Sequence, residues 1–362
     1  MRYSLIIPVY NRPEEVDELL DSLTRQTFRD FEVIVVEDGS QERCEAVAGK
    51  YADRLDIKYL EKPNSGPGQS RNYGAERSQG EYLIVLDSDV VLPEGYLEAV
   101  ERELKENPCE AFGGPDRAHE SFTPVQKAIN YSMTSFFTTG GIRGGKKKLD
   151  KFYPRSFNMG IRRDLYEQLG GFSNMRFGED IDFSIRIFKS GARCRLFPEA
   201  WVWHKRRTDF RKFFRQVHNS GIARINLYKK YPESLKLVHL LPAVFTIGVA
   251  LLAFVFLVGL LFVILGLYAG FCCGTGCNMG LVVAFGGLAL ILLAVFPLLL
   301  YKLLILIDSS VRNRSLWVGV LSIPASFIQL IGYGTGFLRA WWLRCVCGRN
   351  EELQAFKKNF YK

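Results

Sequence analysis

The chain has 362 residues, a formal net charge of +9 and a mean hydropathy of +0.02, which is high for a soluble protein. From Leu240 to Tyr301 there is no Asp, Glu, Lys, Arg or His, although about 20 apolar residues suffice for one helical span. Basic residues cluster before and after this region, which favours a membrane surface over a nucleic-acid groove. We therefore expect the membrane as a partner, and no nucleic acid.

The first elements alternate between strands and helices. Tyr3 to Tyr10 is expected to be a buried strand, and Asn11 to Glu15 begins a helix with acidic residues in its first turn. Phe31 to Val36 and Ile57 to Leu60 are further strands. These units predict a parallel sheet with right-handed crossovers. Met1 leads straight into the first strand without a signal peptide, so we expect this part to stay in the cytoplasm.

A Gly-rich loop, Asn64 to Asn72, leads into a helix expected over Asn72 to Ser78. The free N–H groups of a helix N-terminus bind phosphates readily, and Arg71 adds a bidentate donor. An ordinary loop with a helix cap explains the same residues, and both interpretations stay open.

Glu81 to Asp89 is a strand-like run that ends in two aspartates, Asp87 and Asp89. A buried strand does not readily hold unpaired carboxylates, so we place them at its carboxyl end, where open α/β sheets bind ligands. Two carboxylates this close repel each other unless a cation lies between them, and oxygen ligands suit Mg²⁺ or Mn²⁺. The alternative is an acidic turn.

A helix is expected to open at Leu92 and run through Leu104, and Ser121 to Lys151 then shows little periodicity. We expect this stretch to be an irregular loop. It contains the basic segment Arg143 to Lys148, which fits either a loop near an acceptor or membrane surface, or a solvated run of charges.

Two later segments carry titratable side chains. Phe157 to Asp164 reads as a strand end and a helix start, and Glu179, Asp180 and Asp182 fall at another helix start. Acidic residues there are partly explained by the helix dipole, and a pair of them could also supply a general base. Asp182 is spaced to pair with Arg186 on the helix surface.

The segment Ala200 to Arg207 reads as an aromatic strand that ends in His204 and three cations. His204 is either structural or a contact for a metal or a diphosphate. Phe210 to Tyr231 is basic, aromatic and helical in pattern. It suits a helix lying in the lipid headgroups, or alternatively a helix that caps the soluble domain.

Together these segments resemble the family 2 glycosyltransferases over about Met1 to Gly221. The resemblance is carried by five motifs in order: Ile-Ile-Pro8-Val-Tyr10-Asn11, Glu37-Asp38-Gly39-Ser40, Asn64-x-Gly66 with Arg71-Asn72, Asp87-Ser88-Asp89, and Gly178-Glu179-Asp180. It implies the nucleotide-sugar-binding GT-A fold, an α/β class with a mostly parallel sheet and helices on both faces.

The resemblance also implies a donor site. Pro8 and Tyr10 would line the nucleoside pocket, and Asp38 would hold the base. Arg71 would lie near the base and the phosphates, and Asp87 near the ribose.

It further implies a metal and a general base. Asp89 would hold Mn²⁺ or Mg²⁺ on the diphosphate, and His204 matches a position that approaches the metal or the diphosphate. Asp180 would deprotonate the acceptor hydroxyl, with Glu179 beside it. The family inverts the anomeric carbon by a single displacement.

Two departures from the family pattern bear on function. The family often has two aspartates where this chain has Glu37-Asp38, and the base-binding position is kept. Processive relatives carry Gln-x-x-Arg-Trp after the base, whereas Arg215 to Gly221 reads Arg-Gln-Val-His-Asn-Ser-Gly. We therefore expect addition of one sugar rather than polymer synthesis.

The sequence predicts three domains: a catalytic domain over 1–235, a membrane region over 236–345 and a basic tail over 346–362. Spans are expected at about 240–267, 281–303 and 316–338, with a tight turn from Gly270 to Gly280. Three crossings from a cytoplasmic catalytic domain put the basic tail outside, against the positive-inside rule. Either the third stretch is re-entrant or interfacial, as its Pro and Gly residues permit, or the rule fails; its length favours three crossings.

We therefore expect an integral protein of the inner or plasma membrane with a cytoplasmic catalytic domain. It would be a hexosyltransferase-type enzyme that moves one sugar from a UDP- or GDP-linked donor to a lipid-linked or cell-surface glycan acceptor. Transfer to polyprenyl phosphate is the alternative, with Lys205, Arg206 and Arg207 available for the phosphate. A catalytically inactive nucleotide-sugar-binding subunit is an alternative of another class.

Overall fold

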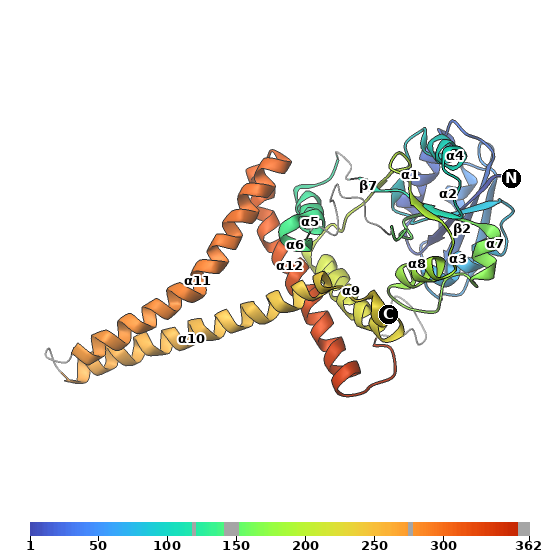
Figure 1. Ribbon diagram of the computed structural model, residues 1–362. Helices are drawn as coiled ribbons and strands as arrows, with labels where there is room; N and C mark the ends of the chain where they lie inside the picture. The colour runs from blue at the N-terminus through green and yellow to red at the C-terminus, as the bar shows by residue number, and fades with distance from the viewer. Residues whose placement is uncertain (118–120, 141–151, 274–277, 354–362) are drawn as a thin grey trace. The chain divides into compact units, whose positions relative to one another are not determined.

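The computed structural model describes residues 1–117, 121–140, 152–273 and 278–353. The chain divides into two compact units, which are described separately (Figure 1). The α/β unit comprises Met1–Phe122, Lys146–Arg206 and Glu351–Lys362. The helical unit comprises Thr123–Gly145 and Arg207–Asn350. The basic segment from Arg143 to Lys148 lies outside the described residues, and so does most of the basic tail.

The α/β unit is built on a seven-stranded sheet in the order β3-β2-β1-β4-β8-β6-β9. Strands β3, β2, β1 and β4 run parallel, β8 is antiparallel to both β4 and β6, and β6 is parallel to β9. The prediction of a mostly parallel sheet is confirmed. The strands are β1 (Tyr3–Val9), β2 (Phe31–Asp38), β3 (Ile57–Lys62), β4 (Tyr82–Leu86), β6 (Ala111–Gly113), β8 (Asn158–Arg162) and β9 (Cys194–Leu196).

Each face of this sheet has its own hydrophobic core. On one face, alternate β1 residues such as Leu5 pack with the apolar sides of α1 (Pro13–Thr24) and α4 (Tyr96–Glu106), near α2 (Glu45–Gly49). On the other face, Ile6 and Leu83 pack with α3 (Pro67–Ala75), α7 (Arg163–Gln168) and α8 (Glu179–Lys189). Because β1, β2 and β4 are covered on both sides, they read as continuous apolar runs rather than alternating ones.

A smaller sheet lies beyond the end of β4. It has the order β5-β10-β7 and consists of β5 (Val90–Val91), β10 (Val202–His204) and β7 (Asp116–Arg117). His204 pairs with Val90 in antiparallel register. This pairing brings the end of β10 beside the two aspartates that follow β4.

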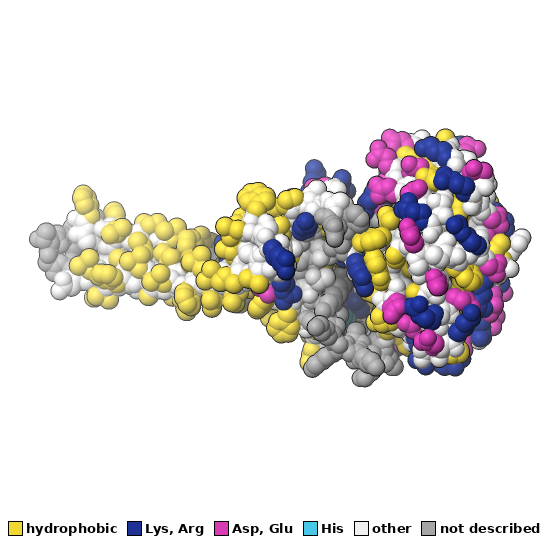
Figure 2. Space-filling view, turned by 90° about the horizontal axis from the view of Figure 1, so that it is seen from above, with side chains coloured by type: hydrophobic (Ala, Val, Ile, Leu, Met, Phe, Trp, Pro, Cys, Tyr) yellow, Lys and Arg dark blue, Asp and Glu magenta, His cyan; other side chains and the backbone are white. Residues whose placement is uncertain are grey.

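The helical unit is organised around α12 (Leu316–Trp341), which packs against α5, α9, α10 and α11. Its other helices are α5 (Pro124–Thr134), α6 (Phe136–Thr139), α9 (Phe210–Lys230), α10 (Leu241–Cys273) and α11 (Asn278–Asn313), with the short turns η1 (Pro232–Ser234), η2 (Leu237–Leu240) and η3 (Trp342–Val346). Helices α10 and α11 form an antiparallel hairpin (Figure 1). Their side chains are largely apolar and exposed, as Figure 2 shows.

Three helices are long and apolar enough to cross a membrane: Leu237–Phe271, Asn278–Asn313 and Leu316–Val346. They coincide with the three predicted spans, although each runs further along the chain. The third is one continuous helix despite Pro324. The turn predicted between Gly270 and Gly280 falls partly on residues 274–277, outside the described residues.

Two predicted elements are wrong. The helix expected from Asn72 begins at Pro67, because Gly66 takes a positive φ of 90° that ends the loop and Pro at the first turn favours a helix. The stretch expected to be irregular contains α5, whose Thr123 and Gln126 form a capping box. Its helical signal was weak because α5 buries side chains of mixed polarity, including Gln126 and Ser132.

Glycines let α12 approach its neighbours closely, as small residues do between membrane helices. A Cβ at Gly221 of α9 would lie 2.2 Å from the carbonyl oxygen of Tyr333, and a Cβ at Gly336 would lie 2.1 Å from that of His218. The glycine run of α12 therefore serves packing, with Gly332 and Gly336 against α9 and Gly334 against α10, and does not break the helix.

We expect Gly221→Ala to lower the free energy of unfolding by about 1–3 kcal/mol, because the added methyl group overpacks the contact with α12. The matched control is Gly248→Ala on α10, where a Cβ meets nothing within 4 Å. Melting temperatures of the two detergent-purified variants test this. Equal melting temperatures would contradict the packing role of Gly221.

Candidate active site

Asp87 and Asp89 directly follow β4 and precede β5, so the predicted position at the carboxyl end of the strand is correct. Both strands are held by pairing, β4 in the large sheet and β5 in the small one. The two aspartates therefore lie on a short segment fixed at both ends.

Asp89 is held by a histidine and an arginine. Its Oδ1 lies 3.2 Å from Nε2 of His204, and its Oδ2 accepts a 2.5 Å hydrogen bond from Nη1 of Arg12. Burial acts to raise the pKa of Asp89, but His204 and Arg12 outweigh it and hold that pKa well below its ordinary range. Burial acts to lower the pKa of His204, and Asp89 reverses this effect and raises it.

Arg71 joins two other carboxylates. It donates from Nη2 to Asp87 Oδ1 at 2.8 Å and from Nη1 to Glu179 Oε1 at 3.1 Å. Its side chain is only 3% exposed, and its guanidinium lies over the Phe172 ring. Burial and the adjacent Asp180 raise the pKa of Glu179 to about 7, although Arg71 acts in the opposite direction.

Glu179 and Asp180 begin α8, after Gly178 in the left-handed region at φ 87°. Asp180 Oδ2 accepts a 2.6 Å hydrogen bond from Nε of Arg155, and its Oδ1 accepts one from the backbone of Ile181. Both residues are buried, which removes the carboxylates from bulk water. The predicted pair between Asp182 and Arg186 is present at 3.0 Å.

Asp38 lies at the end of β2 in a separate set of hydrogen bonds. Its carboxylate is 1% exposed and accepts from Lys62, at 2.6 Å, and from the backbone N–H groups of Ser65 and Gly66. The backbone N–H groups of Ser65 and Gly66 therefore bind Asp38, which agrees with the interpretation of this segment as an ordinary loop with a helix cap. Asn64 also donates to Asp38.

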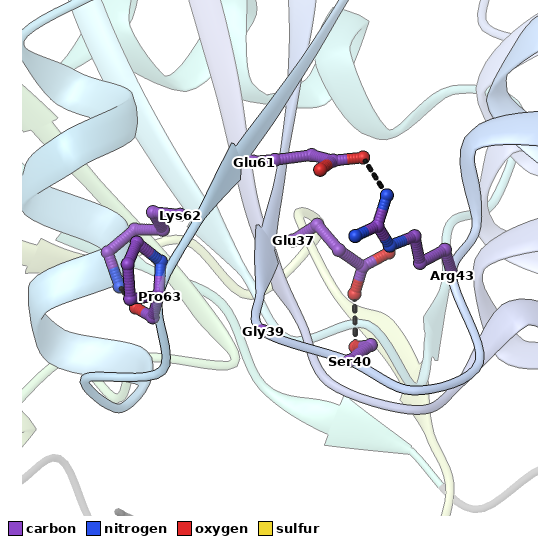
Figure 3. Close-up of a pocket in the computed structure, with 7 residues that line it drawn as sticks. All are labelled: Glu37, Gly39, Ser40, Arg43, Glu61, Lys62 and Pro63. Atoms are coloured by element: carbon purple, nitrogen blue, oxygen red, sulfur yellow. Dashed lines mark hydrogen bonds and ion pairs between the residues drawn. The ribbon is translucent and has the colours of Figure 1, made fainter. Parts of the chain in front are cut away.

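A pocket of about 400 Å³ opens beside this group, at the ends of β2 and β3 (Figure 3). Arg43 pairs with Glu61 across it, and Ser40 donates to Glu37. It is lined by Glu37, Gly39, Ser40, Arg43, Glu61, Lys62 and Pro63.

Pro8, Tyr10 and the basic cluster after His204 are the remaining residues predicted for the site. Pro8 is buried in β1 opposite Val36, and Tyr10 follows the strand and is half-buried. In the basic cluster, Lys205 pairs with Glu18 at 2.8 Å and Arg206 pairs with Asp116. Two of the three cations proposed for a lipid phosphate are thus already engaged.

The sequence did not single out Arg12, Arg155 or Lys62, yet each binds a predicted site carboxylate. Arg12 carried one usable signal: it follows the motif that ends at Asn11. Arg155 and Lys62 carried no local signal, since arginine and lysine are common at the surface.

The residues present fit a divalent cation. Within the described part of the chain, Asp87, Asp89 and His204 each offer one ligand atom, and these atoms lie within 4.8 Å of one another. Nδ1 of His204 is buried without a hydrogen-bond partner, and the ring stacks on Phe157. Two carboxylates with one imidazole suit Mn²⁺, and the carboxylates alone suit Mg²⁺.

Part of the chain is similar to known glycosyltransferases. Residues 4–170 match the family described as Glycosyl transferase family 2. The chain is 27% identical over 205 residues to an uncharacterized glycosyltransferase, EpsJ, of Bacillus subtilis, covering 54% of this chain and 58% of the relative. It is 39% identical over 93 residues to the poly(ribitol-phosphate) beta-N-acetylglucosaminyltransferase TarS of Staphylococcus aureus, covering 25% of this chain and 16% of that protein.

Among solved structures, the mannosyltransferase PcManGT from Pyrobaculum calidifontis, in complex with GDP-Man and Mn²⁺, aligns with a TM-score of 0.49 and 20% identity. The alignment covers 65% of each chain.

Residues 4–170 thus form a domain similar to the family 2 glycosyltransferases, and the mostly parallel sheet with helices on both faces confirms the expected α/β class. Three helices long and apolar enough to span a membrane follow it. The chain spans about three fifths of the length of the first curated relatives that it matches, 58% and 62%.

Proposed function

We propose that this chain transfers one sugar, with inversion, from a nucleotide-sugar to a lipid-linked or cell-surface glycan acceptor at a membrane. The observation that carries the proposal is the convergence of Asp87, Asp89 and His204 with the buried Arg71–Glu179 pair, within a family 2 domain. The carboxyl ends of strands in open α/β sheets are where such folds bind ligands.

The donor nucleotide would lie along the ends of β1, β2 and β4. Pro8 and Tyr10 would line the nucleoside site, and Asp38 would hold the base through the loop that it orders. Asp87 would reach the ribose, and Arg71 would meet the phosphates. Lys62, which lines the pocket in Figure 3, binds Asp38, and this supports a base site at this end of the sheet.

Asp89 and His204 would hold Mn²⁺ or Mg²⁺. A bound divalent cation would stabilise the negative charge that develops on the leaving nucleoside diphosphate. Asp89 suits this role because its low pKa keeps it ionised across the physiological range. The chain's own cations, Arg12 and Arg71, lie in the same site and add to the positive field.

Asp180 would be the general base. The acceptor hydroxyl would approach the anomeric carbon from the face opposite the diphosphate and pass its proton to Asp180. Arg155 holds one carboxylate oxygen of Asp180 and so fixes its orientation. Glu179 binds the buried Arg71 and would orient that arginine, whereas the arginine that binds Asp180 is 39% exposed, so we propose Asp180 as the base.

The acceptor is proposed on two grounds. Long apolar helices with exposed side chains support an acceptor that resides at a membrane. The likeness to the Staphylococcus aureus protein, which is named for transfer to poly(ribitol-phosphate), supports a cell-surface glycan. The ion pairs of Lys205 and Arg206 lend less support to polyprenyl phosphate as the acceptor.

A donor screen tests the proposal. Detergent-purified protein would be mixed with UDP- and GDP-sugars and Mn²⁺ or Mg²⁺, with and without polyprenyl phosphate, and release of nucleoside diphosphate followed. Metal-dependent release from one donor supports the enzyme. Stimulation by polyprenyl phosphate would favour the alternative acceptor, and binding of UDP or GDP without turnover on any acceptor would favour an inactive subunit.

We expect Asp89→Asn to weaken Mn²⁺-dependent binding of the nucleotide at least about tenfold, because the metal loses a charged ligand. Calorimetric titration with UDP or GDP in Mn²⁺ and in EDTA measures this. The control is Asp21→Asn, which removes an exposed carboxylate of α1 whose ion pair among the described residues is with Arg25. Unchanged metal dependence in Asp89→Asn would place the metal elsewhere.

A further inference from the structure

Arg12 occupies an unfavourable position by the rules of helix formation. It is the N-cap of α1 and makes no side-chain capping bond. N-caps are normally Ser, Thr, Asp or Asn, and a cation at a helix N-terminus opposes the helix dipole. A residue that breaks such rules is expected where a functional site needs that side chain.

The turn before α1 is fixed in a way that aims Arg12 at Asp89. Asn11 adopts a positive φ of 51°, which a non-glycine residue rarely takes. Its Oδ1 accepts from the backbone of Gln41 and Glu42, and its N–H donates to Ser40 Oγ. The loop after β2 therefore locks the turn.

In this arrangement both aspartates of the cluster that could hold the metal, Asp87 and Asp89, are already paired with an arginine. Asp87 binds Arg71 and Asp89 binds Arg12. A divalent cation arriving alone would meet two guanidinium groups, and like charges this close repel. If the cation takes the aspartates, the two arginines lose their partners. The phosphate oxygens of a nucleoside diphosphate that arrives with the cation can bind both arginines instead.

Of the two arginines, Arg12 is the one free to move. Arg71 is 3% exposed, is held from both sides by Asp87 and Glu179, and lies over Phe172. Arg12 is 31% exposed, and its partner Asp89 is fixed between β4 and β5. A long, partly exposed side chain can change partner without disturbing the sheet.

We propose that Arg12 is a positioning residue that holds Asp89 Oδ2 until the nucleotide arrives and then passes to the diphosphate, which couples binding of the divalent cation to binding of the nucleotide. This inference rests on the proposed function, since it takes Asp89 as a metal ligand. It assigns to Arg12 a role in the order of binding, in addition to the positive charge that Arg12 brings to the site.

The test measures Mn²⁺ binding rather than turnover. The full-length protein in detergent would be titrated with Mn²⁺, following the electron paramagnetic resonance signal of free Mn²⁺, without nucleotide and with saturating UDP or GDP. We expect the nucleotide to tighten Mn²⁺ binding to the native protein by about tenfold or more, within the usual range of coupling between sites.

Arg12→Gln should bind Mn²⁺ alone more tightly than the native protein, by about tenfold, and gain less from the nucleotide. Arg12→Lys keeps the charge and should retain most of the coupling, which guards against a general folding defect. The matched control is Arg25→Gln, at the other end of α1, whose only ion pairs in the described structure are with the exposed Asp21 and Glu94.

The outcomes separate the two ideas. Loss of Mn²⁺ binding in Asp89→Asn supports the proposed metal site, and its persistence there would refute that site and the Arg12 inference with it. If Asp89→Asn loses Mn²⁺ but Arg12→Gln binds Mn²⁺ alone no more tightly than the native protein, the role of Arg12 is overturned while the metal site stands.

Discussion

Asp180→Asn is expected to reduce sugar transfer about 10³-fold, within the 10²–10⁴-fold range of general base catalysis. Asparagine has nearly the same shape and can still accept the hydrogen bond from Arg155, but it cannot take a proton from the acceptor hydroxyl. Donor binding should change by no more than about twofold, since none of the contacts proposed for the nucleotide involves Asp180.

Two measurements check this result. Initial rates of transfer give the loss of turnover, and calorimetric titration with the nucleotide gives donor affinity. Asp164→Asn is the control. Asp164 and Asp180 both lie in the first turn of a helix, α7 and α8, but Asp164 is exposed and Asp180 is buried. Turnover of Asp180→Asn equal to that of the control would remove Asp180 as the base.

The sequence predicted the parts of the site that depend on single segments. Each strand and the acidic residues after it form one local pattern, so Asp38, Asp87 and Asp89 could be placed at strand ends. The acidic start of α8 was likewise visible, because Gly178 and the carboxylates are adjacent in the chain.

The partners of these carboxylates could not be predicted. Arg12 and Asp89 are 77 residues apart, and Arg155 and Asp180 are 25 apart. Such pairs arise from the crossovers that bring distant loops to one edge of the sheet. No periodic pattern in the sequence indicates which distant residues will meet there. For the same reason the family resemblance implied that Asp38 holds the base, but the sequence did not show that Lys62 and a loop bury Asp38.

In the helical unit, too, features of a single segment were predicted, whereas contacts between segments were not. Composition predicted the spans, because an uncharged apolar run of this length has few alternatives to forming membrane-spanning helices. The Pro and Gly residues of α12 also permitted a re-entrant or interfacial stretch, whereas in the structure Gly336 lies against His218 of α9. Whether a glycine breaks a helix or permits close packing depends on its neighbour, which the sequence of one helix does not contain.

Arg71→Met is expected to lower the free energy of unfolding by about 3–5 kcal/mol at pH 8, as when one partner of a buried ion pair is removed. Asp87 and Glu179 would each lose the arginine, and Glu179 is 12% exposed. Methionine fills similar space over Phe172, so the loss measures charge more than packing.

The loss should depend on pH. The pKa of Glu179 is already raised from 4.5 to about 7 in the folded protein, so its ionisation opposes folding as pH rises through that window. Without Arg71 this pKa rises further, and the ionised form becomes less favourable still. The difference in stability between Arg71→Met and the native protein should therefore be larger at pH 8 than at pH 5.5, where Glu179 is mostly protonated.

Melting temperatures of the full-length protein in detergent at the two pH values measure this difference. The control is Arg77→Met, which removes an exposed cation paired with Glu76. Adding Glu179→Gln to Arg71→Met should recover part of the loss at pH 8, because the carboxylate left without its arginine is then gone. An equal loss at both pH values, without recovery in the double variant, would mean that Arg71 acts through packing and that Glu179 is not its charged partner.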